Sequence, residues 1–537
     1  MKRREFLSTA LGVAAAGLAP RSARASSGLV EVLLDEPIGT IAPELQGHFT
    51  EHIGEVIYNG IWVGENSKIP NVGGIRKVLV DHMRQLRAPV IRWPGGCFAD
   101  SYNWRDGVGP RSQRPMRTNF WNNTSELLKV PDGPQKYDPN TFGTAEFIRF
   151  CQLCGAQPYL AANVRSQTPL DFDQWVEYCN SPAGSTTLAQ TRASDGSRDP
   201  FDVTYWGVGN ESWGCGGNFR PEEYATEFRR FTAWVPNYGK KLRYIASGPG
   251  AEESDTQVSW TRGFFENLVG KSTHLIDRVF GLSLHYYCGG NGKDDSLKFD
   301  THEWYALLKQ SDFMDPLISQ HWEVMGEYDR QRKARLVVDE WGAWHQSTSI
   351  GPAYLFSCVP SLRDALVTAI NLDIFNRHAD KLAMCNLAQL VNNINTLFLA
   401  MEDKFVATTV FHVFDMYKAH QGGRSVRMVC DAPGISFGEG NSLWGLAGSA
   451  SLKGKTLVAT VVNPHATEPK NVEISLRGGA AKSALVTVLT APDIHAHNDF
   501  DHPGDVVPKT ETAALSGSRF QWTFAAASVT KLEIDLS

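Results

Sequence analysis

The sequence YWGVGNESWG, residues 205–214, joins an apolar run to a glutamate inside a glycine-rich turn. Residues 203–208 have the composition of a buried strand, and Asn210 and Glu211 follow almost directly. A carboxylate at the carboxyl end of a buried strand is where a parallel α/β barrel places its chemistry. A glutamate that only supports the start of the next helix would give the same local pattern.

A second stretch repeats this layout. The sequence RLVVDEWG, residues 335–342, is again an apolar strand that leads to a glutamate, Glu340, and then to tryptophan and glycine. Two carboxylates at two strand ends are what a two-carboxylate glycosidase requires. The pair therefore favours glycosidic bond hydrolysis over a purely structural role for either residue.

The region between these stretches and on either side of them alternates strands with helices. Eight strands are predicted, which is the number in a (β/α)8 TIM barrel, here assigned to residues 43–400. The strands are expected at residues 46–52, 88–98, 158–164, 203–211, 242–248, 279–287, 335–342 and 382–390. Helices are expected between them, for example at residues 72–86, 144–154, 221–238, 302–320 and 361–380.

After about residue 401 the helical pattern stops. Short β-prone segments separated by turn residues follow, beginning with residues 406–414, and they predict a C-terminal all-β sandwich, jelly-roll-like, over residues 401–537. A strand near the N-terminus, within residues 26–42, has no place in the barrel. We expect it to join the sandwich.

Residues 1–25 resemble a twin-arginine-type signal peptide. Arg3 and Arg4 precede an apolar run, and Ala23-Arg24-Ala25 has the form of a cleavage site. This pattern predicts a periplasmic or secreted protein. A net charge of −6 and a pI near 6.2 argue against nucleic acid or an anionic membrane as partner. Nine cysteines show no recognisable disulfide or zinc spacing.

The carboxyl ends of the predicted strands should meet on one face of the barrel. They carry three carboxylates, two amides and several aromatic rings, but no set of His or Cys metal ligands, so we expect no metal and no other cofactor. The residues concerned are Glu51, Cys97, Asn210, Glu211, His285, Tyr287, Glu340 and Gln389.

Motifs along most of the chain resemble those of the glycoside hydrolase family 51 α-L-arabinofuranosidases. They include GHFTEH at 47–52, RWPGGCFAD at 92–100, the stretch from Trp206 to Gly217, VDEWG at 338–342 and NLAQLVN at 386–392. The resemblance implies a retaining exo-enzyme that removes terminal α-L-arabinofuranosyl groups from arabinan- or arabinoxylan-type saccharides. It also implies a homo-oligomer, commonly a hexamer.

The resemblance also implies roles for individual residues. Glu211, at the end of the fourth strand, is expected to be the acid/base, and Glu340, at the end of the seventh, the nucleophile. The sugar-binding residues implied are Glu51, Cys97, Asn210, Tyr287 and Gln389, with His285 as an orienting partner and Trp104 and Trp121 as walls of the pocket.

Two other functions remain open from the sequence. An endo-β-glucanase or a β-xylosidase could use the same two glutamates. The loops around the site decide whether it is a closed pocket or an open groove, and their shape cannot be read from sequence. A carbohydrate-binding protein with a retired active site is a third possibility, disfavoured because Glu211 and Glu340 are both present.

Overall fold

A closed barrel of eight parallel strands forms the centre of the computed structural model of this protein. The structure describes residues 28–123, 132–250, 254–290, 292–346 and 355–537. Neighbouring strands pair in the order β10-β11-β12-β13-β2-β5-β8-β9, which confirms the predicted TIM barrel. Their bounds are β2 Gly47–Phe49, β5 Val90–Trp93, β8 Gln157–Ala162, β9 Tyr205–Val208, β10 Arg243–Ala246, β11 Val279–Cys288, β12 Arg335–Ala343 and β13 Leu382–Ala388.

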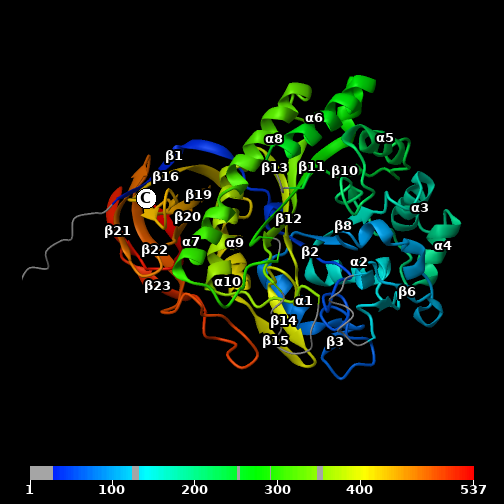
Figure 1. Cartoon of the computed structure of the whole chain (residues 1–537), viewed down its shortest axis with the longest axis horizontal. Helices are drawn as coiled ribbons and strands as arrows, with labels where there is room; N and C mark the ends of the chain where they lie inside the picture. The colour runs from blue at the N-terminus through cyan, green and yellow to red at the C-terminus, as the bar shows by residue number, and fades with distance from the viewer. Residues whose placement is uncertain (1–27, 124–131, 251–253, 291, 347–354) are drawn as a thin grey trace, which may run out of the picture.

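Helices surround the barrel (Figure 1). They bury their apolar faces against the strands, for example Leu79 and Met83 of α1 and Phe147 and Phe150 of α2. Their bounds are α1 Lys77–Leu86, α2 Thr144–Cys154, α3 Pro169–Asn180, α4 Thr187–Ser194, α5 Pro221–Phe231, α6 Ser254–Lys271, α7 Thr301–Ser311, α8 Met314–Tyr328, α9 Leu362–Arg377 and α10 Thr409–Tyr417. Among the described residues, no helix has both the length and the apolarity needed to cross a bilayer.

Proline explains two helices whose predicted extents were wrong. The helix predicted at 221–238 ends at Phe231, and Pro236 lies in the loop that follows. The helix predicted at 302–320 is two helices, because the chain turns at residues 312–313 and restarts with Pro316 in the first turn of α8. Proline is tolerated in the first turn of a helix and disrupts its interior.

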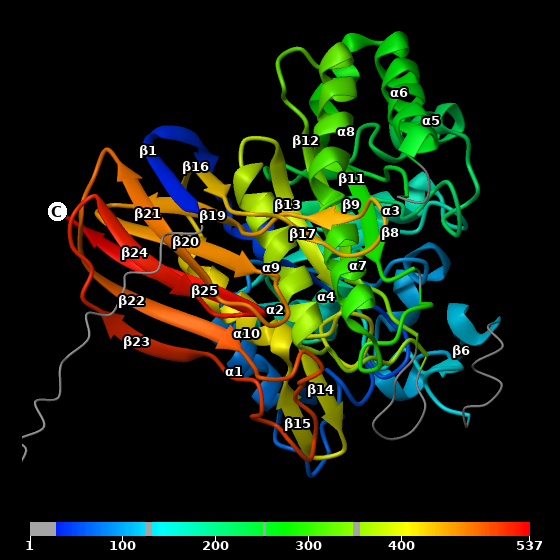
Figure 2. The ribbon, with the colours of Figure 1, turned by 60° about the vertical axis from the view of Figure 1, so that its left-hand side comes forward.

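A nine-stranded sheet lies beside the barrel (Figure 2). Its order is β23-β22-β25-β20-β19-β16-β1-β21-β24, so β1 pairs antiparallel with β16 and parallel with β21. Strands from both halves of this order share one apolar core, which shows that the sheet curls around it. The bounds are β1 Leu29–Thr40, β16 Arg424–Asp431, β19 Ala447–Lys453, β20 Thr456–Asn463, β21 Lys470–Arg477, β22 Ala481–Thr490, β23 Lys509–Ala513, β24 Arg519–Phe524 and β25 Ser528–Leu536.

One strand predicted after residue 401 is a helix. Residues 406–414 were expected to be extended, but β15 ends at Ala407 and α10 begins at Thr409. The β-branched and aromatic residues of this segment recur at helical spacing, and Val410, Val413, Phe414 and Tyr417 are all buried. Packing of this face against α9 and the Trp341 ring therefore outweighs the β-propensity of the segment.

A buried carboxylate joins the barrel helices to the nine-stranded sheet. Asp373 of α9 accepts hydrogen bonds from Ser449 of β19 at 2.6 Å, from Thr460 of β20 at 2.5 Å and from Tyr417 of α10 at 2.9 Å. In Figures 1 and 2, α9 and α10 lie between the sheet and the barrel. The polar network thus fixes the sheet to the barrel at a defined position.

Replacing Asp373 by alanine is expected to destabilise the protein by about 3 kcal/mol, because three buried hydroxyl donors would lose their acceptor. Urea unfolding of Asp373→Ala beside the parent protein measures this. The matched control is Asp380→Ala: the Asp380 side chain is 41% exposed and pairs with the neighbouring Lys381, so its loss should cost under about 1 kcal/mol. Equal effects of the two substitutions would contradict the role given to Asp373.

Candidate active site

The barrel brings six of the predicted residues to one end. Glu51 follows β2, Asn210 and Glu211 follow β9, and Gln389 follows β13, while His285 lies within β11 and Glu340 within β12. Because all eight strands run parallel, these positions share the carboxyl face of the barrel. The contacts described next show that their side chains converge.

Glu340 is the most strongly held of these carboxylates. Arg92 donates to its Oε1 at 2.7 Å, Tyr287 donates its hydroxyl to Oε2 at 2.8 Å, and His285 Nδ1 lies 3.6 Å from Oε2. Burial alone would raise the pKa of Glu340, but the charges of His285 and Arg92 and the donated hydrogen bonds lower it below its usual value. Glu340 is therefore ionised and suited to nucleophilic attack.

Arg92 connects the two strand ends that carry the glutamates. Its Nη2 donates to Asn210 Oδ1 at 2.5 Å, and its Nε lies 3.4 Å from Asp339 Oδ2. Asp339 in turn accepts from Tyr159 and Asn386, each at 2.8 Å. Arg92 is fully buried, so this network supplies the counter-charges that a buried guanidinium requires.

Glu211 lies across the site from Glu340. Its Oε1 is 3.0 Å from His285 Nδ1, and one oxygen of Glu211 lies within 4.8 Å of one oxygen of Glu340. The pKa of His285 is raised: burial would lower it, but the charges of Glu340 and Glu211 outweigh burial. His285 thus lies between the two glutamates, hydrogen-bonded to Glu211 and at ion-pair distance from Glu340.

The backbone at Glu211 is held in an unusual conformation. Its φ of +38° lies in the left-handed region that non-glycine residues rarely adopt. The neighbouring amides fix it: Asn210 donates its N–H to Asp100 at 2.9 Å, and Ser212 donates to Ser247 at 3.1 Å. Such conformations concentrate at functional sites because the surrounding structure enforces them.

Glu51 places a third carboxyl group near Glu340. It accepts from the Phe98 N–H at 2.9 Å and from Gln389 Nε2 at 3.2 Å. Burial, followed by the charge of Glu340, raises the pKa of Glu51 to about 7. A Cβ at Gly96 would lie 2.8 Å from Glu340 Oε1, so only glycine lets the loop after β5 pass this close to the carboxylates.

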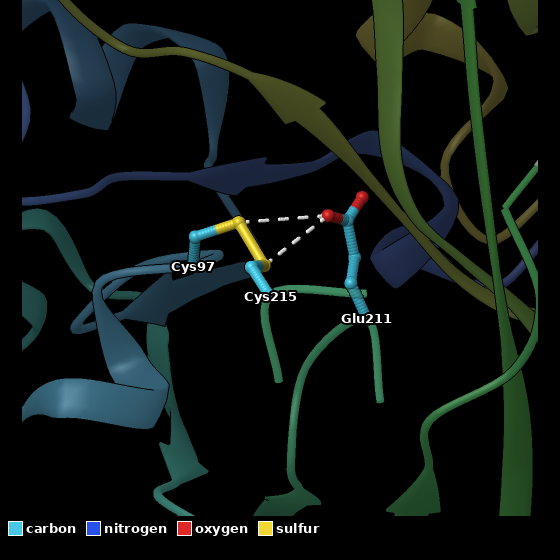
Figure 3. Close-up of side chains that lie close together, drawn as sticks. All are labelled: Cys97, Glu211 and Cys215. Carbon is cyan, nitrogen blue, oxygen red and sulfur yellow. Dashed lines mark hydrogen bonds between the residues drawn. A yellow bond between two sulfur atoms is a disulfide. The ribbon is translucent and has the colours of Figure 1, made fainter. Parts of the chain in front are cut away.

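Cys97 differs from its sequence-based interpretation. We expected Cys97 among the sugar-binding residues and saw no recognisable disulfide spacing, but Cys97 forms a disulfide with Cys215, 118 residues further along the chain. Both sulfurs face Glu211 Oε2, at 3.6 Å from Cys97 and 3.5 Å from Cys215 (Figure 3). Sequence spacing could not predict this pair, because its proximity arises only when the barrel closes.

The two predicted tryptophans occupy different environments. Trp121 is half-buried and packs edge-to-face with Phe356, with Ile53 of the loop after β2 in the same cluster. Trp104 is buried against α3, where it stacks on Trp175 and donates to the Asp171 carbonyl at 3.0 Å. The contacts of Trp104 are thus with α3, whereas Trp121 lies beside the loop that carries Glu51.

Three residues of the site were absent from the predicted set: Arg92, Cys215 and Trp344. Trp344 packs edge-to-face on Tyr287, with ring centroids 5.5 Å apart. Arg92 stands within the RWPGG motif, which was the available signal for it. No spacing signal pointed to Cys215 or Trp344.

Glu211, His285 and Glu340 also bring one ligand atom each within 4.8 Å, as a divalent cation would require. The guanidinium of Arg92, 2.7 Å from Glu340, already places a positive charge there. Two carboxylates, one held ionised, with a histidine between them therefore suit acid/base and nucleophilic chemistry better than metal binding.

Comparison with known proteins identifies similar chains over nearly the whole length. Residues 82–287 match the model of the alpha-L-arabinofuranosidase 1 domain and residues 339–528 that of the alpha-L-arabinofuranosidase C-terminal domain. An intracellular exo-alpha-L-arabinofuranosidase of Bacteroides ovatus is 36% identical over 517 residues, 95% of each chain.

Solved structures give the same picture. The GH51 arabinofuranosidase from Xanthomonas axonopodis pv. citri is 35% identical, with a TM-score of 0.88 over 95% of this chain and 100% of that one. The alpha-L-arabinofuranosidase from Thermotoga maritima, in an arabinose complex, is 27% identical, with a TM-score of 0.81 over 95% and 100% of the two chains.

One prediction is corrected by these comparisons. The N-terminal sequence predicted a periplasmic or secreted protein, but the Bacteroides ovatus relative, similar over 95% of this chain, is named an intracellular enzyme. The predicted signal, residues 1–25, lies outside the described residues. A basic start followed by a short apolar run is a weak signal, because few residues define it. The export prediction is therefore withdrawn.

The raised pKa of Glu51 predicts a pH-dependent stability. The folded protein keeps this proton up to about pH 7, whereas an unfolded chain loses it near the ordinary value of 4.5. Stability from this group is therefore complete at low pH and is lost as the pH rises to about 7. Glu51→Gln cannot ionise, so it should be more stable than the parent by about 3 kcal/mol at pH 8 and equal to it at pH 4.

Urea unfolding at the two pH values measures this difference. The new amide can be accommodated, because Gln389 Oε1 has no hydrogen-bond partner within the described part of the chain and can accept from it. Glu222→Gln is the control, since the Glu222 side chain is 42% exposed and should change stability equally at both pH values. A Glu51→Gln effect that does not depend on pH would contradict the assignment.

Proposed function

Because this chain belongs to the glycoside hydrolase family 51 α-L-arabinofuranosidases, we propose that it removes terminal α-L-arabinofuranosyl groups with retention of anomeric configuration. Glu340 is the nucleophile and Glu211 the acid/base. The observation that carries the proposal is the distance of at most 4.8 Å between one oxygen of each glutamate. Retaining glycosidases have carboxyl groups about 5 Å apart, whereas inverting enzymes leave room for a water molecule between them.

In the first step, the ionised Glu340 attacks the anomeric carbon while Glu211 gives its proton to the departing oxygen. Arg92 and Tyr287 hold the two oxygens of Glu340, at 2.7 and 2.8 Å, so the carboxylate has a fixed direction of attack. The bond to the leaving group breaks as the bond to Glu340 forms. The product is a glycosyl ester on Glu340.

In the second step, Glu211 takes a proton from water, and the resulting hydroxide attacks the anomeric carbon and releases Glu340. Glu211 has given up its proton in the first step, so its carboxylate is free to accept one from water. His285, 3.0 Å from Glu211, can keep this carboxylate oriented through both steps. The same side chain thereby serves as acid and then as base.

The remaining residues around Glu340 are suited to hold the sugar. We assign Glu51, Asn210, Tyr287 and Gln389 to the subsite for the arabinofuranosyl ring, because each offers a buried polar group near Glu340. Asn210 is fixed by Arg92 and Glu51 by Phe98 and Gln389, so these groups are already oriented before substrate binds.

The substrate proposed is a saccharide of the arabinan or arabinoxylan type, attacked at its non-reducing ends. The Bacteroides ovatus relative is named an exo-enzyme, which supports terminal attack. Cleavage of β-glucans or β-xylosides is not favoured, since both family models that match are those of arabinofuranosidases. A homo-oligomer is part of the proposal, and light scattering would measure its mass.

A panel of 4-nitrophenyl glycosides tests the substrate and the stereochemistry together. We expect hydrolysis of the α-L-arabinofuranoside, with the α-anomer of arabinose formed first, as followed by proton NMR. Turnover confined to a β-glucoside or β-xyloside would overturn the substrate assignment, and first formation of the β-anomer would overturn the retaining mechanism.

Substitution of Glu340 and of Glu211 should reduce kcat/KM in different ways. Glu340→Ala should lose at least about 10⁴-fold in kcat/KM on every arabinofuranoside, because no nucleophile remains. Glu211→Ala should lose about 10³-fold on an alkyl arabinofuranoside but much less on a dinitrophenyl one, whose leaving group needs no proton. Azide should accelerate Glu211→Ala on the dinitrophenyl substrate, because it attacks the glycosyl ester without a base.

Steady-state kinetics of both variants on both substrates measures this contrast. Glu222→Ala, on the exposed surface of α5, serves as the control and should keep parent rates. If both variants lost the same factor on both substrates, the separate roles of Glu211 and Glu340 would be wrong.

A further inference from the structure

We propose that the oxidation state of the Cys97–Cys215 pair tunes the acid/base, and that opening the disulfide to two thiols moves the working pH range of the enzyme downward. The inference rests on the proposed role of Glu211. Its basis is the contact in Figure 3, where both sulfurs lie against the same oxygen of Glu211, at 3.6 and 3.5 Å.

The disulfide connects the two loops that border Glu211. Cys97 lies in the loop after β5, next to Gly96 and the carboxylates, and Cys215 lies four residues after Glu211, in the loop before α5. Asn210 Nδ2 also lies 3.8 Å from the Cys215 sulfur. The bond therefore links the loop of the acid/base to the loop after β5, a strand that β8 separates from β9 in the barrel.

The oxidation state of the sulfurs determines what they offer to Glu211. A disulfide sulfur carries no hydrogen, so it can only accept, weakly, a hydrogen bond from the protonated carboxyl. The disulfide is therefore compatible with the acid form that the first step needs. A thiol carries a hydrogen and can donate it to the same oxygen, and donation to a carboxylate favours its ionised form.

Other groups that face Glu211 are unchanged by reduction. They are His285 and Tyr287 of β11 and Glu340 of β12. None of them contains sulfur, so a redox-dependent pH profile reports on Cys97 and Cys215.

The loop of Glu211 has supports besides the disulfide. The Glu211 carbonyl accepts from the N–H groups of Gly214 at 2.8 Å and Gly216 at 3.1 Å, and Phe219 donates its N–H to Ser212 at 2.7 Å. These bonds do not depend on the sulfurs. We therefore expect the loop to keep its path when the disulfide opens, so that the effect is reversible.

Opening the disulfide requires two electrons and two protons. With a water-soluble trialkylphosphine, phosphorus attacks one sulfur and the S–S bond breaks. Water then supplies the oxygen of the phosphine oxide, and its two hydrogens complete the two thiols. Cys97 and Cys215 are both half-buried, whereas six of the seven unpaired cysteines are buried.

The first measurement is a thiol count by alkylation of the denatured protein and mass spectrometry. Seven labelled thiols are expected without reductant and nine with it, in line with the seven unpaired cysteines. Nine thiols in protein purified without reductant would overturn the inference at this point.

The second measurement is the pH dependence of kcat/KM on an alkyl arabinofuranoside, for the oxidised and the phosphine-reduced protein. We expect reduction to move the alkaline limb to lower pH by about half to one unit, because the ionised form of Glu211 becomes easier to reach. Reoxidation should restore the original limb. An identical profile in both states, with the opened disulfide verified by the thiol count, would overturn the inference.

Two double variants separate hydrogen donation from tethering. Cys97→Ala with Cys215→Ala removes the link and offers no donor, so its alkaline limb should stay where the oxidised protein has it. The Cys97→Ser/Cys215→Ser variant offers two hydroxyl donors to Glu211, so its alkaline limb should lie at the same pH as that of the reduced protein. A limb in the alanine variant that matches the reduced protein would overturn the donor argument.

Cys430→Ala is the matched control, because Cys430 is half-buried, unpaired and in β16 of the nine-stranded sheet. It should respond to phosphine as the parent does. The leaving-group contrast of Glu211→Ala tests the proposed function separately. If that contrast holds while the redox shift is absent, only the inference about the disulfide fails.

Discussion

The buried guanidinium of Arg92 is the charge around which the catalytic end of the barrel is arranged. A positive charge in a closed apolar barrel is tolerable only with close counter-charges and satisfied hydrogen bonds. Asp339 and Glu340 provide the counter-charges, and Glu340 and Asn210 accept hydrogen bonds from the guanidinium, from two different strand ends. Arg92 also acts on its partners: its charge keeps Glu340 ionised, and its hydrogen bond holds one oxygen of Glu340 in place. The neutralisation of one buried charge thus orients the side chains of Glu340 and Asn210.

This arrangement gives chemically identical side chains different properties. Three glutamates lie within one small region, yet Glu340 has a lowered pKa because cationic groups and donors surround it, whereas burial and the charge of Glu340 raise the pKa of Glu51. Glu211 faces a histidine on one side and two sulfurs on the other. Division of roles among the carboxylates therefore follows from their neighbours.

Sequence reasoning succeeded where one local pattern repeats and failed where distant segments meet. The eight barrel strands were identified because each is an apolar run with a polar exit, and the strand ends then placed Glu211 and Glu340 on one face. The segment at 406–414 was misassigned because its β-branched and aromatic residues have strand propensity, while its burial as a helix depends on α9 and Trp341. Trp104 was grouped with the pocket by resemblance, yet it packs on α3.

Strand periodicity and the residues at strand ends are local properties of the chain, so the barrel, the adjoining β-rich region and the positions of Glu211 and Glu340 could be predicted from sequence alone. Which cysteines pair, which carboxylate Arg92 holds, and where His285 lies between Glu211 and Glu340 became known from the folded chain. The physical reason is that these contacts join residues far apart in sequence, such as Cys97 and Cys215 at a separation of 118. Electrostatic and covalent partners of this kind exist only after the barrel has closed.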